Sequence, residues 1–358
     1  MKSSVDSAPE IAAVGLALPP NYAEQEVLTA ALREHWTRKY GNSRRLNEFH
    51  RAVSVRGRHL ALPLTDYPAL DTFAKSNQAW IKAAAEVGEA AVRSALDRAG
   101  LAPADIDHLF FVTVTGIATP SVETRIINRL GMRPTVKRTP IFGLGCVAGA
   151  AGVARASDYV RAFPGHTALL LSVELCSLTL QHDDLSPANL IASGLFGDGA
   201  AAVVIAGAQR PASGGPRVIA TQSVLYPDTE RLMGWDIVES GFKVILSPRV
   251  PDVVEQNLGA DVDGFLADQG MDRSAIRHWI AHTGGPKVLR AIESALSLPC
   301  DALERSWRSL RDIGNLSSAS VLFVLADLLA AGQAKAGEYG LLIAMGPGFC
   351  SELVLLEW

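Results

Sequence analysis

The sequence predicts an α/β fold in which a buried sheet carries helices on its faces. A helical hydrophobic pattern over residues 83–99 is followed by a short β-branched and aromatic run at 108–115, and a second such run stands at 167–173. Turn residues bound each run, as expected for strands. Alternation of helix and strand is typical of a mostly parallel sheet buried between helices.

Each element of this pattern has its own local signal. Val92, Leu96 and Ala99 follow the i, i+4, i+7 spacing of one helix face, and Gly100 is placed to end that helix. Further apolar runs stand at 279–282, 340–346 and 352–358, and a helix is expected to begin near Asn315. The Pro, Gly and Ser cluster AQRPASGGPR after Ala208 predicts a boundary between an N-terminal half, 1–210, and a C-terminal half, 211–358.

Composition limits the classes of partner. The chain has 358 residues, of which 48% are hydrophobic and 20% charged, which is enough material for a large core. The net charge of -4 gives no general attraction to nucleic acid, so we expect no such partner. Residues 31–60 nevertheless hold a local excess of positive charge, which is either a solvated surface or an anion site; its cations are Arg33, Arg38, Lys39, Arg44, Arg45, Arg51, Arg56 and Arg58.

The cysteines predict a reducing compartment and no metal site. Cys146, Cys176, Cys300 and Cys350 lack the spacing of metal ligands or of a disulfide framework. The early apolar stretch at 11–18 lacks the basic leader of a signal peptide, and no apolar run approaches the roughly 18 residues of a membrane span. We therefore expect a cytoplasmic protein without a membrane span.

The segment GLGCVAGAAGVARASDYV at 143–160 carries the strongest chemical signal. Cys146 stands at the entry to a predicted helix rich in Ala, Gly and Val. Free N–H groups and the positive end of the helix dipole favour a thiolate there, which would be a nucleophile near neutral pH. The alternative is a small buried side chain in the core, because free cysteines are often buried.

A cysteine nucleophile needs partners, and two candidates stand downstream. His282 lies in AHTGGPKVL after an apolar run, and Asn315 lies in GNLSSASVLFVL at a predicted helix start. Taken singly, they could be a structural histidine and a helix N-cap. Together with Cys146 they fit either a papain-like hydrolase or a thioester-condensing enzyme. The hydrolase is disfavoured, because its cysteine lies near the mature N-terminus in a different sequence context.

With these motifs in hand, the sequence resembles the type III polyketide synthases, the family that includes chalcone synthase. The likeness rests on the segment around Cys146, on LFGDGAAAVVI, HTGGPKVL and GNLSSASVLFVL, and on GPGF near the end. It implies a five-layered αβαβα thiolase-like fold of two related halves, a homodimer, and no metal or redox cofactor. It also implies that Cys146 carries the acyl chain, while His282 and Asn315 polarise the carbonyl of malonyl-CoA.

The resemblance assigns further residues to the substrate. Phe196 matches a gatekeeper phenylalanine, Val244 takes the place of a second one, and Trp235 stands where plant enzymes have a small glycine. Other matches to cavity positions are Cys176, Thr179, Thr119 and Ser317, with Thr119 near the partner subunit. Arg45 and Lys287 are implied to bind CoA, whereas Glu48 and Ala52 depart from the family's cationic positions.

Two strings narrow the product that the resemblance implies. VELCSLTLQ and MGWDIVESGFKVILSPRVP are similar to those of bacterial alkylresorcinol and alkylpyrone synthases, which implies a long-chain fatty acyl-CoA starter extended with malonyl-CoA. The alternative is a β-ketoacyl synthase of the initiating type, which works on a carrier protein. A catalytically silent binding protein is the least favoured class, because all three reactive residues stand in family-type contexts.

Overall fold

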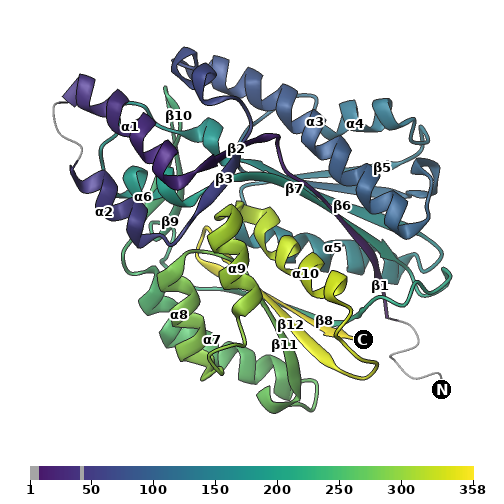
Figure 1. The fold of residues 1–358 in the computed structure, drawn as a ribbon. Coiled ribbons are helices and arrows are strands. Elements are labelled where there is room, and N and C mark those ends of the chain that lie inside the picture. Colours follow the sequence, from purple (N-terminus) through teal and green to yellow (C-terminus); the bar gives the residue numbers. More distant parts are fainter. Residues whose placement is uncertain (1–7, 41–43) are drawn as a thin grey trace.

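The computed structural model describes residues 8–40 and 44–358, and a nine-stranded mixed sheet forms its centre (Figure 1). The strand order is β11-β12-β13-β8-β1-β7-β6-β4-β5. These strands are β1 (Glu10–Ala17), β4 (His108–Thr113), β5 (Lys137–Phe142), β6 (Thr167–Leu175), β7 (Asp198–Ala206), β8 (Arg217–Leu225), β11 (Ile276–Ala281), β12 (Tyr339–Gly346) and β13 (Cys350–Glu357).

Two small hairpin-like sheets and ten α-helices complete the described part of the chain. The small sheets pair β2 (Asn21–Glu24) with β3 (Gly57–Leu60), and β9 (Met233–Val238) with β10 (Gly241–Leu246). The helices are α1 (Gln25–Tyr40), α2 (Arg44–Ala52), α3 (Phe73–Ala99), α4 (Glu123–Leu130), α5 (Ala148–Ala162), α6 (Pro187–Leu195), α7 (Val250–Ala267), α8 (Pro286–Leu296), α9 (Glu304–Ile313) and α10 (Ser320–Ala331).

The large sheet consists of two similar halves. In the first, β1 and β7 are antiparallel, β7 and β6 are antiparallel, and β6, β4 and β5 are parallel neighbours. In the second, β8, β13 and β12 repeat the antiparallel pairs and β11 follows in parallel. The halves join where Glu10 pairs with Arg217. The prediction of a mostly parallel sheet was wrong, because β7 and β13 each run against both of their neighbours, a direction that an apolar strand does not reveal.

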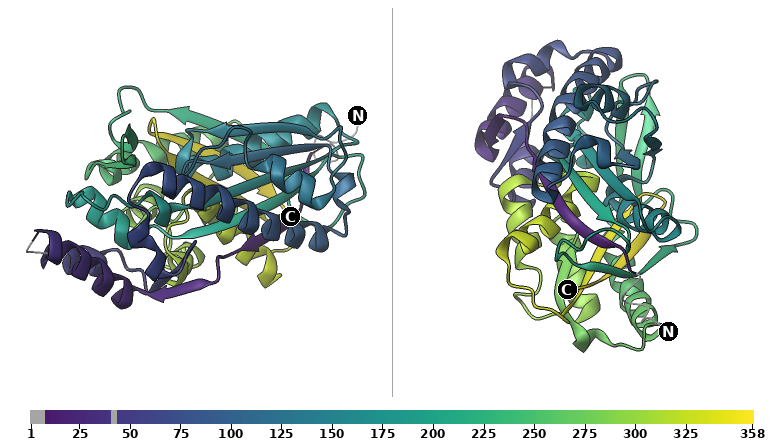
Figure 2. Two further views of the ribbon diagram at one scale, coloured as in Figure 1. Left: turned by 90° about the horizontal axis from the view of Figure 1, so that it is seen from above. Right: turned by 90° about the vertical axis from the view of Figure 1, so that its right-hand side faces the viewer.

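Helices cover both faces of each half and also fill the space between them (Figures 1 and 2). Helices α3 and α4 pack on the outer face of the first half, and α7 and α8 on the outer face of the second. Helices α5 and α10 share one apolar core with strands from both halves. The result is the sequence of five layers, α-β-α-β-α, that the resemblance implied.

Helix α3 illustrates how the sequence determines this packing. It starts ten residues earlier than predicted, at Phe73, where the Thr72 side chain accepts a hydrogen bond from the Lys75 N–H, and it ends at Gly100 in the left-handed conformation. A Cβ on Gly15 of β1 would lie 2.2 Å from the Ala95 nitrogen, so helix and strand backbones are in direct contact. Small residues are required on both elements there.

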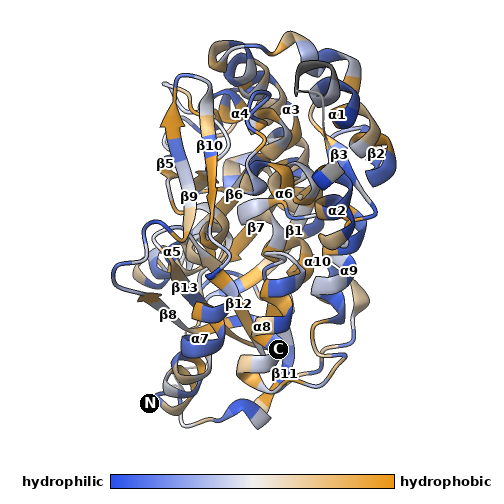
Figure 3. Ribbon diagram, turned by 90° about the vertical axis from the view of Figure 1, so that its left-hand side faces the viewer, coloured by the Kyte–Doolittle hydropathy of each residue, from blue (hydrophilic) through white to orange (hydrophobic). Residues whose placement is uncertain are grey.

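Helices α1, α2 and α6 and the β9–β10 hairpin gather beside the first half of the sheet. In Figure 3 the hairpin lies on one side of α6, and α1 and α2 lie on the other. Helices α1 and α6 and the hairpin contribute side chains to the larger of the two cavities described below. Across residues 8–40 and 44–358, none of the helices combines the length and the apolar character that a membrane crossing requires.

Candidate active site

Cys146 lies in a tight turn at the entry to α5, as predicted. The turn spans Gly145–Val147, directly before α5, and Cys146 is buried. Gly145 has φ 56°, and a Cβ on it would lie 2.6 Å from the Pro347 ring. Only glycine fits this position, so the near-terminal GPGF segment packs against the turn that carries the thiol.

Ser317 links Cys146 to Asn315. The Cys146 Sγ lies 3.6 Å from the Ser317 Oγ, and the Ser317 N–H donates to the Asn315 Oδ1 at 2.8 Å. Ser317 has φ 48°, in the left-handed region that non-glycine residues seldom adopt. Asn315 itself precedes the turn Ser317–Ala319 that leads into α10, so it is not the N-cap of that helix, which is Ala319.

His282 follows the end of β11 and is held by the next strand. The backbone N–H of His282 donates to the Ile343 carbonyl at 2.9 Å, and only 4% of the residue is exposed. Neither ring nitrogen has a hydrogen-bond partner among the described residues. Burial lowers the pKa of His282 to about 4, so the ring is neutral at neutral pH and can either accept or donate a proton.

Burial favours the neutral form of the Cys146 thiol, whereas the sequence analysis predicted a thiolate. Burial raises the pKa of Cys146 to about 12, the hydrogen bond with Ser317 lowers it, and the nearby Glu174 carboxyl raises it. Desolvation therefore outweighs the effect of the helix terminus. Activation of the thiol requires a base at the moment of reaction, and His282 is the predicted one.

Glu174 is a buried acid near Cys146 that the sequence analysis missed. It lies near the end of the apolar strand β6, where its carboxyl accepts hydrogen bonds from the Ser318 hydroxyl, the Thr115 hydroxyl at 2.9 Å and the Val114 N–H at 3.1 Å. Burial raises the pKa of Glu174 to about 7. The signal that could have identified it is an acid within the otherwise apolar run TALLLSVEL.

A small chamber of about 30 Å³ lies against the thiol. Six predicted site residues line it, namely Cys146, Cys176, Phe196, Trp235, Val244 and Ser317. The sequence analysis did not assign the other lining residues, Val114, Gly145, Met233, Gly234, Ile245, Leu246 and Pro347. His282 and Asn315 are buried but are not among the lining residues.

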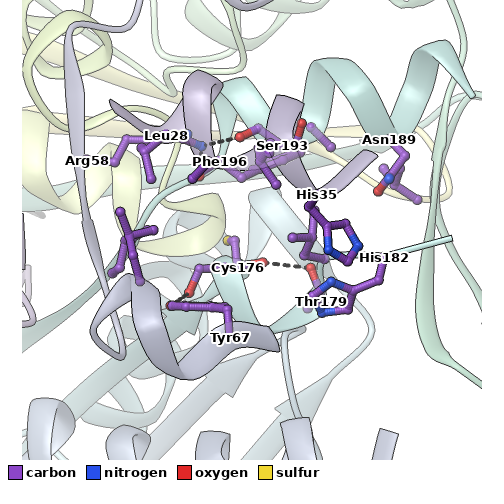
Figure 4. Close-up of a pocket in the computed structure, with 18 of the residues that line it drawn as sticks. Leu28, His35, Arg58, Tyr67, Cys176, Thr179, His182, Asn189, Ser193 and Phe196 are labelled. Atoms are coloured by element: carbon purple, nitrogen blue, oxygen red, sulfur yellow. Dashed lines mark hydrogen bonds between the residues drawn. The ribbon is translucent and has the colours of Figure 1, made fainter. Parts of the chain in front are cut away.

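A second pocket, of about 130 Å³, lies beside this chamber and reaches α1 (Figure 4). The two cavities share Cys176, Phe196, Trp235 and Val244 as lining residues. The second one also contains Thr179 and apolar side chains of α1 such as Leu28 and Leu32. Figure 4 shows His35 and His182 close together beside Thr179. Their rings are arranged edge to face, with 5.4 Å between the ring centroids.

The remaining predicted residues lie outside both cavities. Thr119 is exposed on the loop after β4, Arg45 is exposed on α2, and Lys287 is exposed on the first turn of α8. Arg58 belonged to the predicted basic segment, but it is 3% exposed and lines the second pocket. The side chains of Arg38, Lys39 and Arg44 lie outside the described residues. No cluster of three or more His, Cys, Asp or Glu side chains suited to a metal ion occurs in the described part of the chain.

Comparison with known families gives two adjacent matches. Residues 2–210 match the model of the N-terminal domain of chalcone and stilbene synthases. Residues 217–357 match the model of the C-terminal domain of the same family. The two matches together cover nearly the whole chain.

Individual relatives are similar over the same length. A 1,3,6,8-tetrahydroxynaphthalene synthase of Streptomyces peucetius is 51% identical over 99% of this chain and 94% of its own. A putative chalcone synthase of Bacillus subtilis is 37% identical over 97% of this chain and 98% of its own. The crystal structure of the 1,3,6,8-tetrahydroxynaphthalene synthase of Streptomyces coelicolor, a bacterial type III polyketide synthase, has a TM-score of 0.91 at 32% identity and covers 98% of this chain and 99% of that one.

Proposed function

This chain belongs to the chalcone and stilbene synthase family, the type III polyketide synthases, and on that premise we propose that Cys146, His282 and Asn315 carry out its condensation reaction. The observation that carries the proposal is the apolar chamber against the Cys146 thiol. An apolar chamber of this kind shields a reactive thioester and an enolate from water.

The proposed cycle assigns one role to each residue. His282 takes the proton of Cys146, whose sulfur attacks the acyl-CoA carbonyl and forms a new thioester. The bond to the CoA sulfur breaks, and His282 returns the proton to that sulfur, so that CoA leaves as a thiol. Malonyl-CoA then loses CO2, and the resulting enolate attacks the thioester on Cys146, which forms a C–C bond and releases the thiolate. His282 and Asn315 donate hydrogen bonds to the enolate oxygen, and preorganised donors of this kind supply about 3 to 4 kcal/mol each.

We infer that the product is a compact aromatic polyketide of the tetrahydroxynaphthalene type. The support is the name of the Streptomyces peucetius relative, which is 51% identical over nearly all of this chain. The small volume of the chamber agrees with a chain that folds on itself, and Trp235 occupies part of its wall. Malonyl-CoA would then serve both as starter and as extender.

The second candidate is a fatty acyl starter that ends in an alkylresorcinol or an alkylpyrone, as the sequence strings implied. The observation that favours it is the second pocket, which continues from Cys176 and Phe196 past apolar side chains of α1. Burial of an alkyl chain there is favourable by about 0.8 kcal/mol per methylene. Arg45 and Lys287 are proposed to hold the CoA phosphates from the surface in either case.

We propose a homodimer as the working form. Strand β5 is an edge strand, and exposed edge strands are usually paired or covered. Phe142 at its end is 50% exposed, and Ile117 is 45% exposed. Thr119, two residues after Ile117, would then face the partner subunit, as the resemblance implied.

The test is to incubate the protein with labelled malonyl-CoA alone and with acyl-CoA starters from short to long, with Cys146→Ala as control. An aromatic product from malonyl-CoA alone supports the first candidate, and a product that requires a long-chain starter supports the second. Loss of both products in Cys146→Ala is expected. If malonyl-CoA is consumed only when an acyl carrier protein is added, the chain acts as an initiating β-ketoacyl synthase instead.

A further inference from the structure

The backbone of Asn315 is held by the segment that follows α6. The Asn315 N–H donates to the Leu195 carbonyl at 2.9 Å, and the Asn315 carbonyl accepts from the Gly197 N–H at 2.9 Å. Phe196 and Asn315 thus form an isolated parallel bridge. The position of Asn315 therefore depends on where residues 195–197 lie.

Arg58 of β3 also holds this segment, through hydrogen bonds to its carbonyls (Figure 4). Its Nη1 donates to the Ser193 carbonyl at 2.7 Å and to the Phe196 carbonyl at 2.8 Å. Both carbonyls lie at the C-terminal end of α6, where helix C=O groups lack internal partners and carry partial negative charge. One guanidinium satisfies both of them.

The stem of Arg58 packs against the two glycines of this bridge. A Cβ on Gly314 would lie 2.7 Å from the Leu195 carbonyl oxygen and 3.2 Å from the Arg58 Cδ. A Cβ on Gly197 would lie 3.5 Å from the Arg58 Cβ. Arg58 therefore contacts the residue before Asn315 and the residue after Phe196, which leaves little room for either strand of the bridge to shift.

The charge of Arg58 is balanced by these carbonyls rather than by an ion pair within the described residues. The acid that acts on it through space is Asp198, whose oxygens accept from the Ser177 N–H at 2.8 Å and the Ala61 N–H at 2.6 Å. Burial lowers the pKa of Arg58 to about 10, so it stays charged at neutral pH. A buried charge without a direct counter-ion is costly, and stability alone gives no reason to keep it.

We propose that Arg58 is a positioning residue for the condensation reaction. Arg58 holds the Ser193 and Phe196 carbonyls and so fixes the position of Phe196 in the wall of both cavities. Through the bridge between Phe196 and Asn315, it also fixes the position of Asn315. This inference rests on the catalytic role proposed above for Asn315. Arg58 itself does not touch the reacting atoms in this scheme.

The first test is Arg58→Met, which keeps much of the stem and removes the donors. We expect kcat to fall on the order of 100-fold, because a displacement of about 1 Å at a catalytic group has that effect. The KM for malonyl-CoA should change little, because the displaced Asn315 amide stabilises the transition state rather than the bound ground state. A thermal unfolding curve checks that the variant is folded at the assay temperature.

Arg161→Met is the matched control. Arg161 also donates from one terminal nitrogen to two backbone carbonyls, those of Val218 at 2.7 Å and Ile219 at 3.1 Å, but it lines neither cavity. Its kcat should equal that of the unaltered protein. An equal loss of kcat in both variants would show that the effect is merely structural and would overturn the proposal.

Two further variants are needed, one in case Arg58→Met does not fold and one to separate the role of Arg58 from that of Asn315. If Arg58→Met does not fold, Arg58→Gln replaces it, because the Gln amide nitrogen stands where the Arg Nε does, two bonds short of the Nη1 that reaches both carbonyls. An unchanged kcat in this variant overturns the proposal. Asn315→Ala is measured alongside. Full activity of Asn315→Ala refutes the proposed role of Asn315, whereas full activity of folded Arg58→Met beside an inactive Asn315→Ala refutes only the role of Arg58.

Discussion

At the scale of single residues, polar side chains lie buried in apolar surroundings close to Cys146. All nine residues of β6 are buried, yet the strand contains Ser172 and Glu174. The Ser172 hydroxyl lies 2.9 Å from the Ser318 hydroxyl, which in turn donates to Glu174. Ser318 belongs to the same turn as Ser317. These hydrogen bonds therefore connect strand β6 to the turn that lies beside Cys146.

The raised pKa of Glu174 makes a prediction about the pH dependence of stability. Its pKa is 4.5 in the unfolded chain and about 7 in the folded protein, so the folded state binds the proton more tightly. Protonated Glu174 adds to the free energy of unfolding. This contribution is fully present below about pH 4.5 and is lost as the pH rises through about 7. Glu174→Gln cannot lose a proton, so it should be more stable than the unaltered protein above pH 7, by on the order of 3 kcal/mol.

The measurement is the unfolding free energy of both proteins by urea titration from about pH 5 to about pH 8, because their difference removes the titration of all other groups. Asp272→Asn is the control, since hydrogen bonds from Ser274 lower the pKa of that carboxyl and its titration falls below this range. A flat difference curve for Glu174→Gln would contradict the prediction.

At the scale of elements, the β9–β10 hairpin decides the shape of the cavities. Trp235 and Val244 are paired across it, and both line the chamber and the second pocket. Phe242 anchors the hairpin by an edge-to-face contact with Phe73, at 5.4 Å between ring centroids. The large Trp235 and the smaller Val244, paired across the hairpin, therefore form a wall that the two cavities share.

Trp235→Ala should join the chamber to the second pocket. We expect the variant to use long-chain acyl-CoA starters at least about 10-fold better, relative to malonyl-CoA alone, because the space it frees accepts several methylene groups. The measurement is kcat/KM for a series of starters of increasing length. Ile237→Ala, two residues along the same strand and 64% exposed, is the control. Starter preferences that are identical in the two variants would show that Trp235 does not separate the cavities.

At the scale of the whole molecule, the nine-stranded sheet ends in the unpaired edge of β5. From Arg138 to Phe142 of β5, exposed and half-buried side chains alternate, and Phe142 is 50% exposed at the end of the strand. Apolar surface at a sheet edge is typical of an interface. This edge, with Phe142 and the nearby residues Ile117 and Thr119, is the surface that we propose faces the partner subunit.

Phe142→Asp should weaken the proposed dimer. A charge placed in an apolar interface loses hydration without gaining a partner, which costs several kcal/mol. Light scattering coupled to size-exclusion chromatography should show a shift toward the monomer on dilution. Val27→Asp, on a residue 51% exposed on α1, should leave the mass unchanged. A monomeric unaltered protein would refute the homodimer itself.

The sequence by itself indicated the family and several strands of the large sheet and named the candidate reactive residues, because the turns and the thiol segment of this family have recognisable local patterns. GLGC, for example, needs glycine at 145, where φ is positive and Pro347 lies against the Cα. Only the tertiary structure decided the direction of β7 and β13, the protonation of Cys146, and the burial of Arg58 and Glu174. Those features depend on desolvation and on contacts between segments far apart in the chain, which no local pattern encodes.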